Sequence, residues 1–346
     1  METVEKSHNR WNERHDSSNQ SSGITSTIII IVVLVAIAAI LKRSEKMALF
    51  LRAKKSLSKS IFIILISTLW ISTLAGQIVT GKVIDISTEE ALMYVNIGVV
   101  GHPRGCLTDE TGAFELEISG LSVNTTVRIS MIGYETQTFT IEQLLNDNGG
   151  IIKLVNVSVI LPEIVVKPGK LRKVGAIKTA RGSQSQSHGW ILNFPPNGLE
   201  MGLKLDLGEL PALVKKLHVR VRHNPFDSSL FRLHIRNIVN ELPDDDLLTE
   251  NIFVPVTKRS GWVVIDLSKY NLVFQGEIFL SLELLETKGI NKNRLATLHT
   301  SDGKKQAPIF SFNGSTDQFD TYSKMSSGSQ WRIIEYGTVN FYLTIM

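Results

Sequence analysis

The sequence predicts an all-β protein: two antiparallel β-sandwiches that follow an N-terminal apolar leader. Short runs alternate apolar with polar residues, as in 114–118, where Phe114, Leu116 and Ile118 are separated by two glutamates. Such alternation is typical of half-buried strands. Asp- and Gly-rich turns separate these runs, and no long stretch after the leader shows a 3.6-residue period. We therefore expect apolar interiors and charged surfaces.

The leader has two apolar parts. Residues 24–41 form an uncharged run of 18 residues, a basic stretch follows, and a second apolar run covers 61–74. From Met47 onward the order is that of a secretory signal, with small residues before a cleavage point after Ala75. Either translation starts at Met47, so that 1–46 is an upstream extension and 47–76 a signal peptide, or 24–41 and 61–75 form a membrane hairpin.

The order of the regions after Met47 favours the signal peptide, and both alternatives place residue 77 onward outside the cytoplasm. We expect the periplasm, the outer membrane or the cell surface. An uncleaved leader would hold the protein in the membrane.

Charge and cysteine content exclude some kinds of partner and of binding site. Residues 1–76 hold ten of the 37 Lys and Arg and five of the 33 Asp and Glu, so the rest has 27 basic and 28 acidic residues. A nearly neutral folded part predicts no nucleic-acid partner. The single Cys106 excludes an intramolecular disulfide and a cysteine-based zinc site.

Residues 77–166 read as a sequence of short strands and turns that carries a recognisable motif order. The matching residues are Gly81-x-Val83-x-Asp85, Val95-Asn96-Ile97, Thr108-Asp109-x-x-Gly112-x-Phe114 and Ser130-x-Ile132-Gly133-Tyr134. They resemble the carboxypeptidase regulatory-like domain, which implies a seven-stranded, transthyretin-like sandwich without catalytic residues. Residues 161–166 resemble the segment that links this domain to the plug in TonB-dependent outer-membrane receptors. Only 180 residues follow Val166, so we expect neither plug nor barrel.

Residues 167–187 are rich in Gly, Ser, Lys and Arg and are expected to form a linker. Alternation resumes in 188–346 and predicts a second, jelly-roll-like sandwich. Within it, the runs 217–222 and 231–236 flank a turn at 224–229 and predict a β-hairpin with one apolar and one basic face.

This basic face is a candidate anion-binding site, since Arg side chains pair with planar phosphate or uronate groups. Its residues are Arg220, Arg222, Arg232, His234 and Arg236. The alternative is a solvated outer face that the neighbouring Asp244, Asp245 and Asp246 partly neutralise. We interpret those three aspartates as a surface loop after Pro243, because the spacing of an EF-hand is absent.

Three tryptophans, Trp190, Trp262 and Trp331, are a candidate aromatic platform for stacking on sugars. The alternative is that they belong to the core, and Trp262, after a Gly at a strand start, is then the one we expect to be buried.

No catalytic, cofactor-binding or metal-binding constellation is predicted. The histidines are scattered, and neither HExxH nor Gly-x-Ser-x-Gly occurs. We therefore predict a non-enzymatic, exported envelope protein without cofactor, whose second sandwich binds a polysaccharide or another envelope protein. Two alternatives stay open: a hydrolase whose two catalytic carboxylates are brought together by folding, and a purely structural spacer.

Overall fold

The computed structural model describes residues 32–36, 77–146, 150–157, 169–180, 187–192, 198–301, 303–334 and 337–346. The extension at 1–46, the apolar segments 24–41 and 61–75 and the signal peptide at 47–76 lie outside these residues, apart from a helical turn at 32–36. The segment 161–166 and much of the linker at 167–187 also lie outside them. Among the described residues, no helix has the length and hydropathy needed to cross a bilayer.

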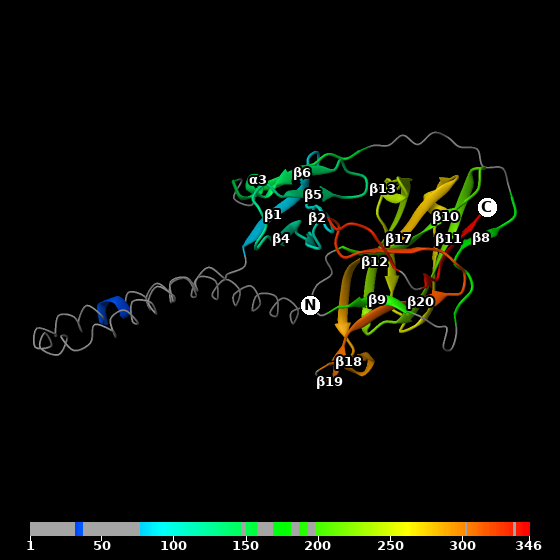
Figure 1. The fold of residues 1–346 in the computed structure, drawn as a ribbon. Coiled ribbons are helices and arrows are strands. Elements are labelled where there is room, and N and C mark those ends of the chain that lie inside the picture. Colours follow the sequence, from blue (N-terminus) through cyan, green and yellow to red (C-terminus); the bar gives the residue numbers. More distant parts are fainter. Residues whose placement is uncertain are drawn as a thin grey trace, which may run out of the picture. The chain divides into compact units, whose positions relative to one another are not determined.

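The first sandwich packs a three-stranded sheet against a four-stranded one (Figure 1). The order of the first sheet is β4-β1-β7, with β1 at Ile78–Asp85, β4 at Ala113–Glu117 and β7 at Ile151–Leu154. The order of the second is β3-β2-β5-β6, with β2 at Asn96–Val99, β3 at Gly105–Leu107, β5 at Thr126–Ser130 and β6 at Gln137–Thr140. The pairs are antiparallel except β1 with β7. A short helix, α3 at Ile141–Asn146, follows β6.

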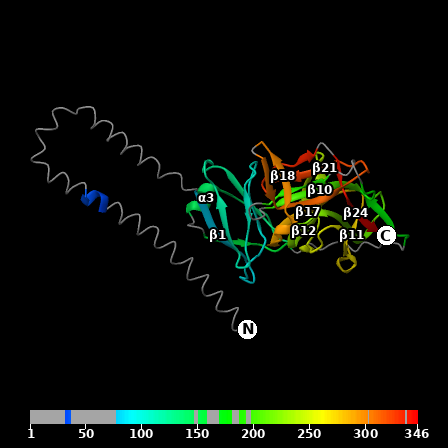
Figure 2. The same cartoon turned by 90° about the horizontal axis from the view of Figure 1, so that it is seen from below.

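The core of this sandwich comes from the apolar positions of the alternating runs. Val83, Val95, Ile97, Val127 and Ile129 have no exposed surface. The turn between β3 and β4 forms as its residues predict: Asp109 accepts hydrogen bonds from the main-chain nitrogens of Thr111 and Ala113, and Gly112 has φ of +77°. These seven strands and α3 form a compact body beside the later strands (Figure 2).

The second sandwich has two larger sheets. We call the first the β12 sheet; its order is β13-β12-β17-β10-β21-β22, and β14 also pairs with β12. Its strands are β10 (Leu199–Asp206), β12 (Phe226–Val239), β13 (Leu242–Asp246), β14 (Ile252–Val256), β17 (Glu277–Ile290), β21 (Thr321–Lys324) and β22 (Arg332–Ile334).

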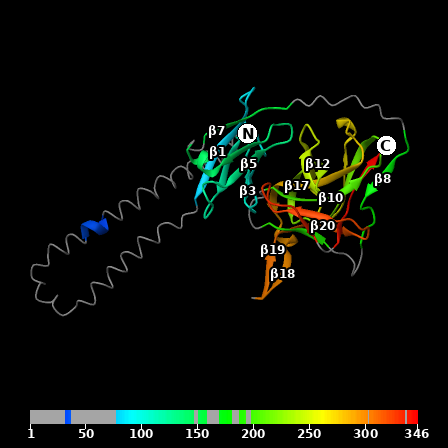
Figure 3. The same ribbon diagram turned by 45° about the horizontal axis from the view of Figure 1, so that its top comes forward.

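We call the other the β11 sheet; its order is β23-β20-β11-β24-β8, with β15 and β16 also paired to β11 and β9 to β20. Its strands are β8 (Arg172–Gly175), β9 (Ser187–Ile191), β11 (Ala212–His223), β15 (Gly261–Asp266), β16 (Val273–Phe274), β20 (Ile309–Ser315), β23 (Thr338–Val339) and β24 (Phe341–Ile345). The 3₁₀ turns η5 (Ser268–Tyr270) and η6 (Lys292–Arg294) connect strands. The hairpin of β18 (Ala296–Thr300) and β19 (Gly303–Ala307) projects from the body (Figure 3).

The predicted hairpin over 217–236 is wrong. Strand β11 pairs with β15, β16, β20 and β24, whereas β12 pairs with β13, β14 and β17. The chain crosses from one sheet to the other at Asn224, whose side-chain amide donates to the carbonyls of Val256 and Lys258. The apolar faces of both strands still meet, because Leu217 on β11 and Phe231 on β12 belong to one core between the sheets.

Candidate functional site

The outer face of the β12 sheet carries a cluster of ionisable side chains that is buried. Arg232, His234 and Arg236 alternate along β12 with the core residues Leu233 and Ile235. The cluster is completed by neighbouring strands and consists of Glu200, Arg232, His234, Arg236, Asp246, Glu283 and Lys324. The expectation that charges stay on the surface is therefore wrong for this face. The interior between the two sheets remains apolar.

Strand register brings the two buried glutamates together. Glu200 on β10 lies directly opposite Glu283 on β17, and both are 1% exposed. Register also places Lys324 opposite Glu200 and Arg232 opposite Glu283. Each carboxylate thus has a cation on the adjacent strand, an arrangement that offsets the penalty of burying charge.

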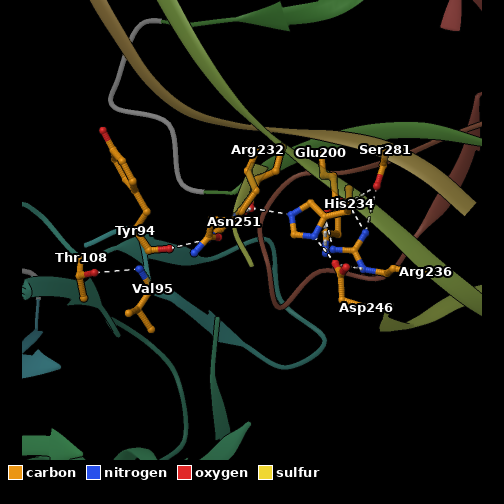
Figure 4. Close-up of polar contacts among 12 residues, drawn as sticks. Tyr94, Val95, Thr108, Glu200, Arg232, His234, Arg236, Asp246, Asn251 and Ser281 are labelled. Carbon is orange, nitrogen blue, oxygen red and sulfur yellow. Dashed lines mark hydrogen bonds and ion pairs between the residues drawn. The ribbon is translucent and has the colours of Figure 1, made fainter. Parts of the chain in front are cut away.

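Glu283 is held by two side chains of β12. Its Oε2 accepts from Arg232 Nε at 2.8 Å, lies 2.6 Å from Arg232 Nη2 and lies 2.9 Å from His234 Nε2. Burial alone would raise the pKa of Glu283, but the charge of Arg232 and the hydrogen bond with His234 outweigh it and lower the pKa to about 2. His234 Nδ1 contacts Asp246 (Figure 4). With its other nitrogen on Glu283, this ring bridges two carboxylates.

Glu200 is held by Arg236, Lys324 and Ser281. Arg236 donates to both carboxylate oxygens, and Lys324 Nζ lies 2.9 Å from Oε2. Burial opposes ionisation, yet Arg236 and Lys324 hold the pKa of Glu200 well below its usual range. The pKa of Lys324 is itself lowered, chiefly because its ammonium group is buried.

The cluster contacts the first sandwich through Arg232. This guanidinium has no exposed surface and donates from Nη1 to the carbonyl of Tyr94 at 3.0 Å and to Asn251 Oδ1 at 3.1 Å (Figure 4). Tyr94 has φ of 61°, a conformation that is unusual for a bulky residue. Its hydroxyl donates to Glu286 at 3.2 Å, and the adjacent Val95 nitrogen donates to Thr108 Oγ1 at 2.8 Å. These contacts therefore hold Tyr94 in a strained conformation in which its carbonyl accepts a hydrogen bond from Arg232.

A second contact between the sandwiches involves the turn after β21. Ser326 Oγ lies 3.3 Å from the carbonyl of His102 and 3.2 Å from that of Arg104. Gly98 of β2 packs against Gly328 of the turn, since a Cβ added to Gly98 would lie 2.3 Å from the Gly328 nitrogen. The absence of side chains at both glycines is what permits this approach.

A cavity of about 470 Å³ lies beside the cluster. His234, Arg236 and Lys324 line it from the second sandwich, and residues 128, 130–134 and 136 line it from the first. The three aspartates at 244–246 also line it, with the first two exposed. They are not in a surface loop as predicted, because Leu242–Asp246 is the strand β13, paired to β12.

The five candidate anion-binding residues do not share one face. Arg232, His234 and Arg236 belong to the buried cluster, where carboxylates already pair with them. Arg220 and Arg222 lie on β11, in the other sheet. The alternating pattern correctly separated polar from apolar positions on each strand, but it did not identify the sheet to which each strand belongs.

The three tryptophans also lie apart. Trp190 is 6% exposed and packs edge-on against Phe312 in the core, at 6.2 Å between ring centroids. Trp331 packs against Phe279, with Lys324 4.8 Å from its ring centroid. Trp262, which we expected to be buried, is half-buried on β15. They therefore form no common platform.

Trp262 and Arg220 meet on the outer face of the β11 sheet. They are register partners, and the guanidinium carbon of Arg220 lies 5.5 Å from the centroid of the Trp262 ring. Trp262 meets Tyr342 edge-on at 5.2 Å, and His218 stacks on Tyr342 at 4.2 Å with an interplanar angle of 9°. We call Arg220, Trp262, Tyr342 and His218 the aromatic–arginine patch.

Lysines flank this patch. Lys173 Nζ lies 5.4 Å from the Tyr342 ring centroid. Burial, followed by the charges of Lys173 and Lys216, lowers the pKa of His218 to about 4. The imidazole is therefore neutral at pH 7 and stacks as an uncharged ring.

Sequence reasoning missed Glu200, Glu283 and Lys324. A signal was present for Glu283, which lies inside the apolar run 278–285 of a central strand. A lone carboxylate in such a run predicts a buried and paired charge. Among the described residues, no group of three or more His, Cys, Asp or Glu side chains is arranged to hold a metal ion. Burial raises the pKa of Cys106 to about 12, which keeps its thiol protonated at pH 7.

Comparisons with known proteins identify the first sandwich. Residues 79–166 match the model of the CarboxypepD_reg-like domain. A comparison with curated proteins found no match. One similar solved structure contains the cysteine protease and lectin-like domains of Cwp84, a surface-layer-associated protein of Clostridium difficile (10% identity, TM-score 0.30, covering 73% of this chain and 58% of that one).

Two others are the VP2 subviral particle of infectious bursal disease virus (7% identity, TM-score 0.22, 78% and 63% covered) and the Gt strain of the same virus (9% identity, TM-score 0.19, 78% and 62% covered). The chain spans about three fifths of the length of these structures.

Proposed function

Because residues 79–166 are a CarboxypepD_reg-like domain, we propose that this protein is a non-enzymatic, exported envelope protein in which that domain is an accessory module for a polysaccharide-binding sandwich. The second sandwich binds acidic polysaccharide on the outer face of its β11 sheet. The observation that carries the proposal is the stacking of Arg220 on Trp262.

Stacking prepares Arg220 to bind a carboxylate. A guanidinium that lies against an indole ring has less freedom to lose when it pairs with a planar anion, and its fork fits a uronate carboxylate with two hydrogen bonds. The half-buried ring of Trp262, with Tyr342 packed beside it, supplies apolar surface for a sugar ring.

Charge on this face also favours an acidic ligand. Lys173, Lys216 and Arg220 carry positive charge on the described strands of the patch, where Asp266 lies opposite Lys216. Such a surface attracts a polyanion, and the attraction weakens with salt.

The carboxylate pair supports a non-catalytic role. A glycosidase needs one carboxyl group with a raised pKa to act as the general acid. Both Glu200 and Glu283 have lowered pKa values, and arginines hold both as carboxylates. The pair therefore suits ion pairing between strands and not proton transfer.

Replacing Arg220 with alanine should weaken binding to polygalacturonate about tenfold or more, the loss expected for a charge-assisted, bidentate hydrogen bond. Microscale thermophoresis of the full-length protein would measure it, with neutral dextran as the reference polymer. The matched control is Arg332→Ala, which removes an exposed arginine from β22 in the other sheet.

Binding of dextran as tight as that of polygalacturonate, or an unchanged affinity in R220A, would remove the acidic-polysaccharide proposal. The protein would then act through an envelope-protein partner or as a spacer.

The N-terminus of the exported protein tests the proposed signal peptide. If translation starts at Met47 and cleavage follows Ala75, Edman sequencing of the exported protein should begin at Gly76. An N-terminus at Met1 with the protein held in membranes would instead support the hairpin of 24–41 and 61–75.

A further inference from the structure

Three buried oxygens without a hydrogen-bond partner gather where the two sandwiches meet. Within the described residues, six buried side-chain nitrogen or oxygen atoms lack a partner, and Asn96 Oδ1, Glu283 Oε1 and Ser327 Oγ are three of them. Their residues are 8%, 1% and 7% exposed. A buried polar atom without a partner is rare and destabilising, so three together point to a place where a ligand can form hydrogen bonds.

The three residues converge beside Gly198, which has no side chain. A Cβ added to Gly198 would lie 3.2 Å from both Asn96 Oδ1 and Glu283 Oε1, and 3.0 Å from the main-chain nitrogen of Ser327. The space next to this glycine is thus bordered by two unpartnered oxygens and one main-chain nitrogen.

Two of the three residues also line the cavity beside the ionic cluster. Asn96 and Ser327 line the cavity of about 470 Å³, together with the cluster residues His234, Arg236 and Lys324. Exposed side chains, those of Arg128, Asp244 and Asp245, also line it. The cavity therefore extends from solvent-exposed polar groups to the buried side chains of Asn96 and Ser327, and its volume is in the range of small-molecule sites.

Charge selects the kind of ligand. Among the residues that line the cavity, the cations are Arg128, Arg236 and Lys324, and the anions are Asp244, Asp245 and Asp246. These charges nearly balance, with His234 left aside, so neither an anion nor a cation gains much by entering. The buried oxygens nevertheless require hydrogen-bond donors.

We propose that this cavity binds a neutral sugar, whose hydroxyl groups donate to Asn96 Oδ1 and Ser327 Oγ. Hydroxyls suit a balanced polar site because each donates and accepts without adding charge. This site is separate from the aromatic–arginine patch, which lies on the other sheet and takes an acidic polymer. The two proposals therefore stand or fall independently.

Replacing Ser327 with alanine tests the site with little risk to the fold, because its hydroxyl has no partner to lose. Isothermal titration calorimetry of the full-length protein with glucose, galactose and mannose should detect binding of at least one of them. S327A should weaken that binding about fivefold to tenfold, the effect of losing one hydrogen bond. Ser323→Ala, on β21 outside the cavity, is the matched control.

Glucuronate and glucosamine extend the test to charged sugars, and both should bind more weakly than the neutral sugar. Absence of heat with all three neutral sugars would mean that water alone fills the cavity and would overturn the proposal. An unchanged affinity in S327A, or tighter binding of either charged sugar, would overturn it as well. Binding of the neutral sugar should persist in R220A, which separates this site from the patch.

Discussion

Replacing Arg232 with methionine should lower the free energy of unfolding by about 3–5 kcal/mol, the loss measured when one partner of a buried ion pair is removed. The variant leaves Glu283 buried without its main counter-charge, and it removes the hydrogen bonds to Tyr94 and Asn251. Methionine has a similar length and keeps apolar contacts, so the change isolates the charge. Urea unfolding followed by tryptophan fluorescence would measure it.

The double variant R232M with Glu283→Gln should be more stable than R232M alone, because it removes the uncompensated charge. Arg332→Met on the exposed edge strand β22 is the control and should change stability by less than about 0.5 kcal/mol. A loss below about 1 kcal/mol in R232M would contradict a stabilising role for this pair.

Stability should fall steeply as the pH drops from about 4.5 toward 2. The pKa of Glu283 is about 2 in the folded protein and about 4.5 as a reference for the unfolded chain. Between these values the unfolded state binds the proton first, so acid favours unfolding. The contribution is complete above about pH 4.5 and amounts to roughly 3 kcal/mol by linkage. Glu200, whose pKa is also lowered, acts in the same direction.

Glu283→Gln isolates this effect. At pH 7 the amide leaves Arg232 without its carboxylate, so the variant should be clearly less stable than the wild type. That difference should shrink as the pH falls through 4 and 3, because Glu283 of the wild type is then protonated in the unfolded state, which stabilises that state relative to the folded one. Urea unfolding at pH 7, 5, 4 and 3 would measure it, and a difference that does not change with pH would contradict the assignment.

Much of the fold could be predicted from local sequence. Alternation located most strands, as Leu217, Val219 and Val221 illustrate, and turn residues such as Asp109 and Gly112 fixed where strands end. The strand with which each strand pairs could not be predicted in this way. A crossing between sheets at Asn224 and a tight hairpin share the same local signals, because both need a polar turn between alternating runs.

The candidate site was harder to predict for the same reason. The sequence pattern of Arg232, His234 and Arg236 is that of a solvated face, although all three are buried. Alternation shows that a strand face is polar, but it does not show whether other parts of the protein cover that face. Their burial depends on Glu200 and Glu283, which come from strands 30 to 50 residues away in the chain. Arg220 and Trp262 were each predicted as site residues, but only the pairing of β11 with β15 brings them together.

Much of the contact between the two sandwiches uses peptide groups of the first one. Arg232 binds the carbonyl of Tyr94, Ser326 contacts the carbonyls of His102 and Arg104, and the Gly101 nitrogen donates to the Gly328 carbonyl. A carbonyl or amide is the same at every position whatever side chain it carries. The surface side chains around 100–104 can therefore vary over evolution without separating the sandwiches, whereas Gly98 and Gly328, whose lack of a side chain allows the close approach, should resist replacement.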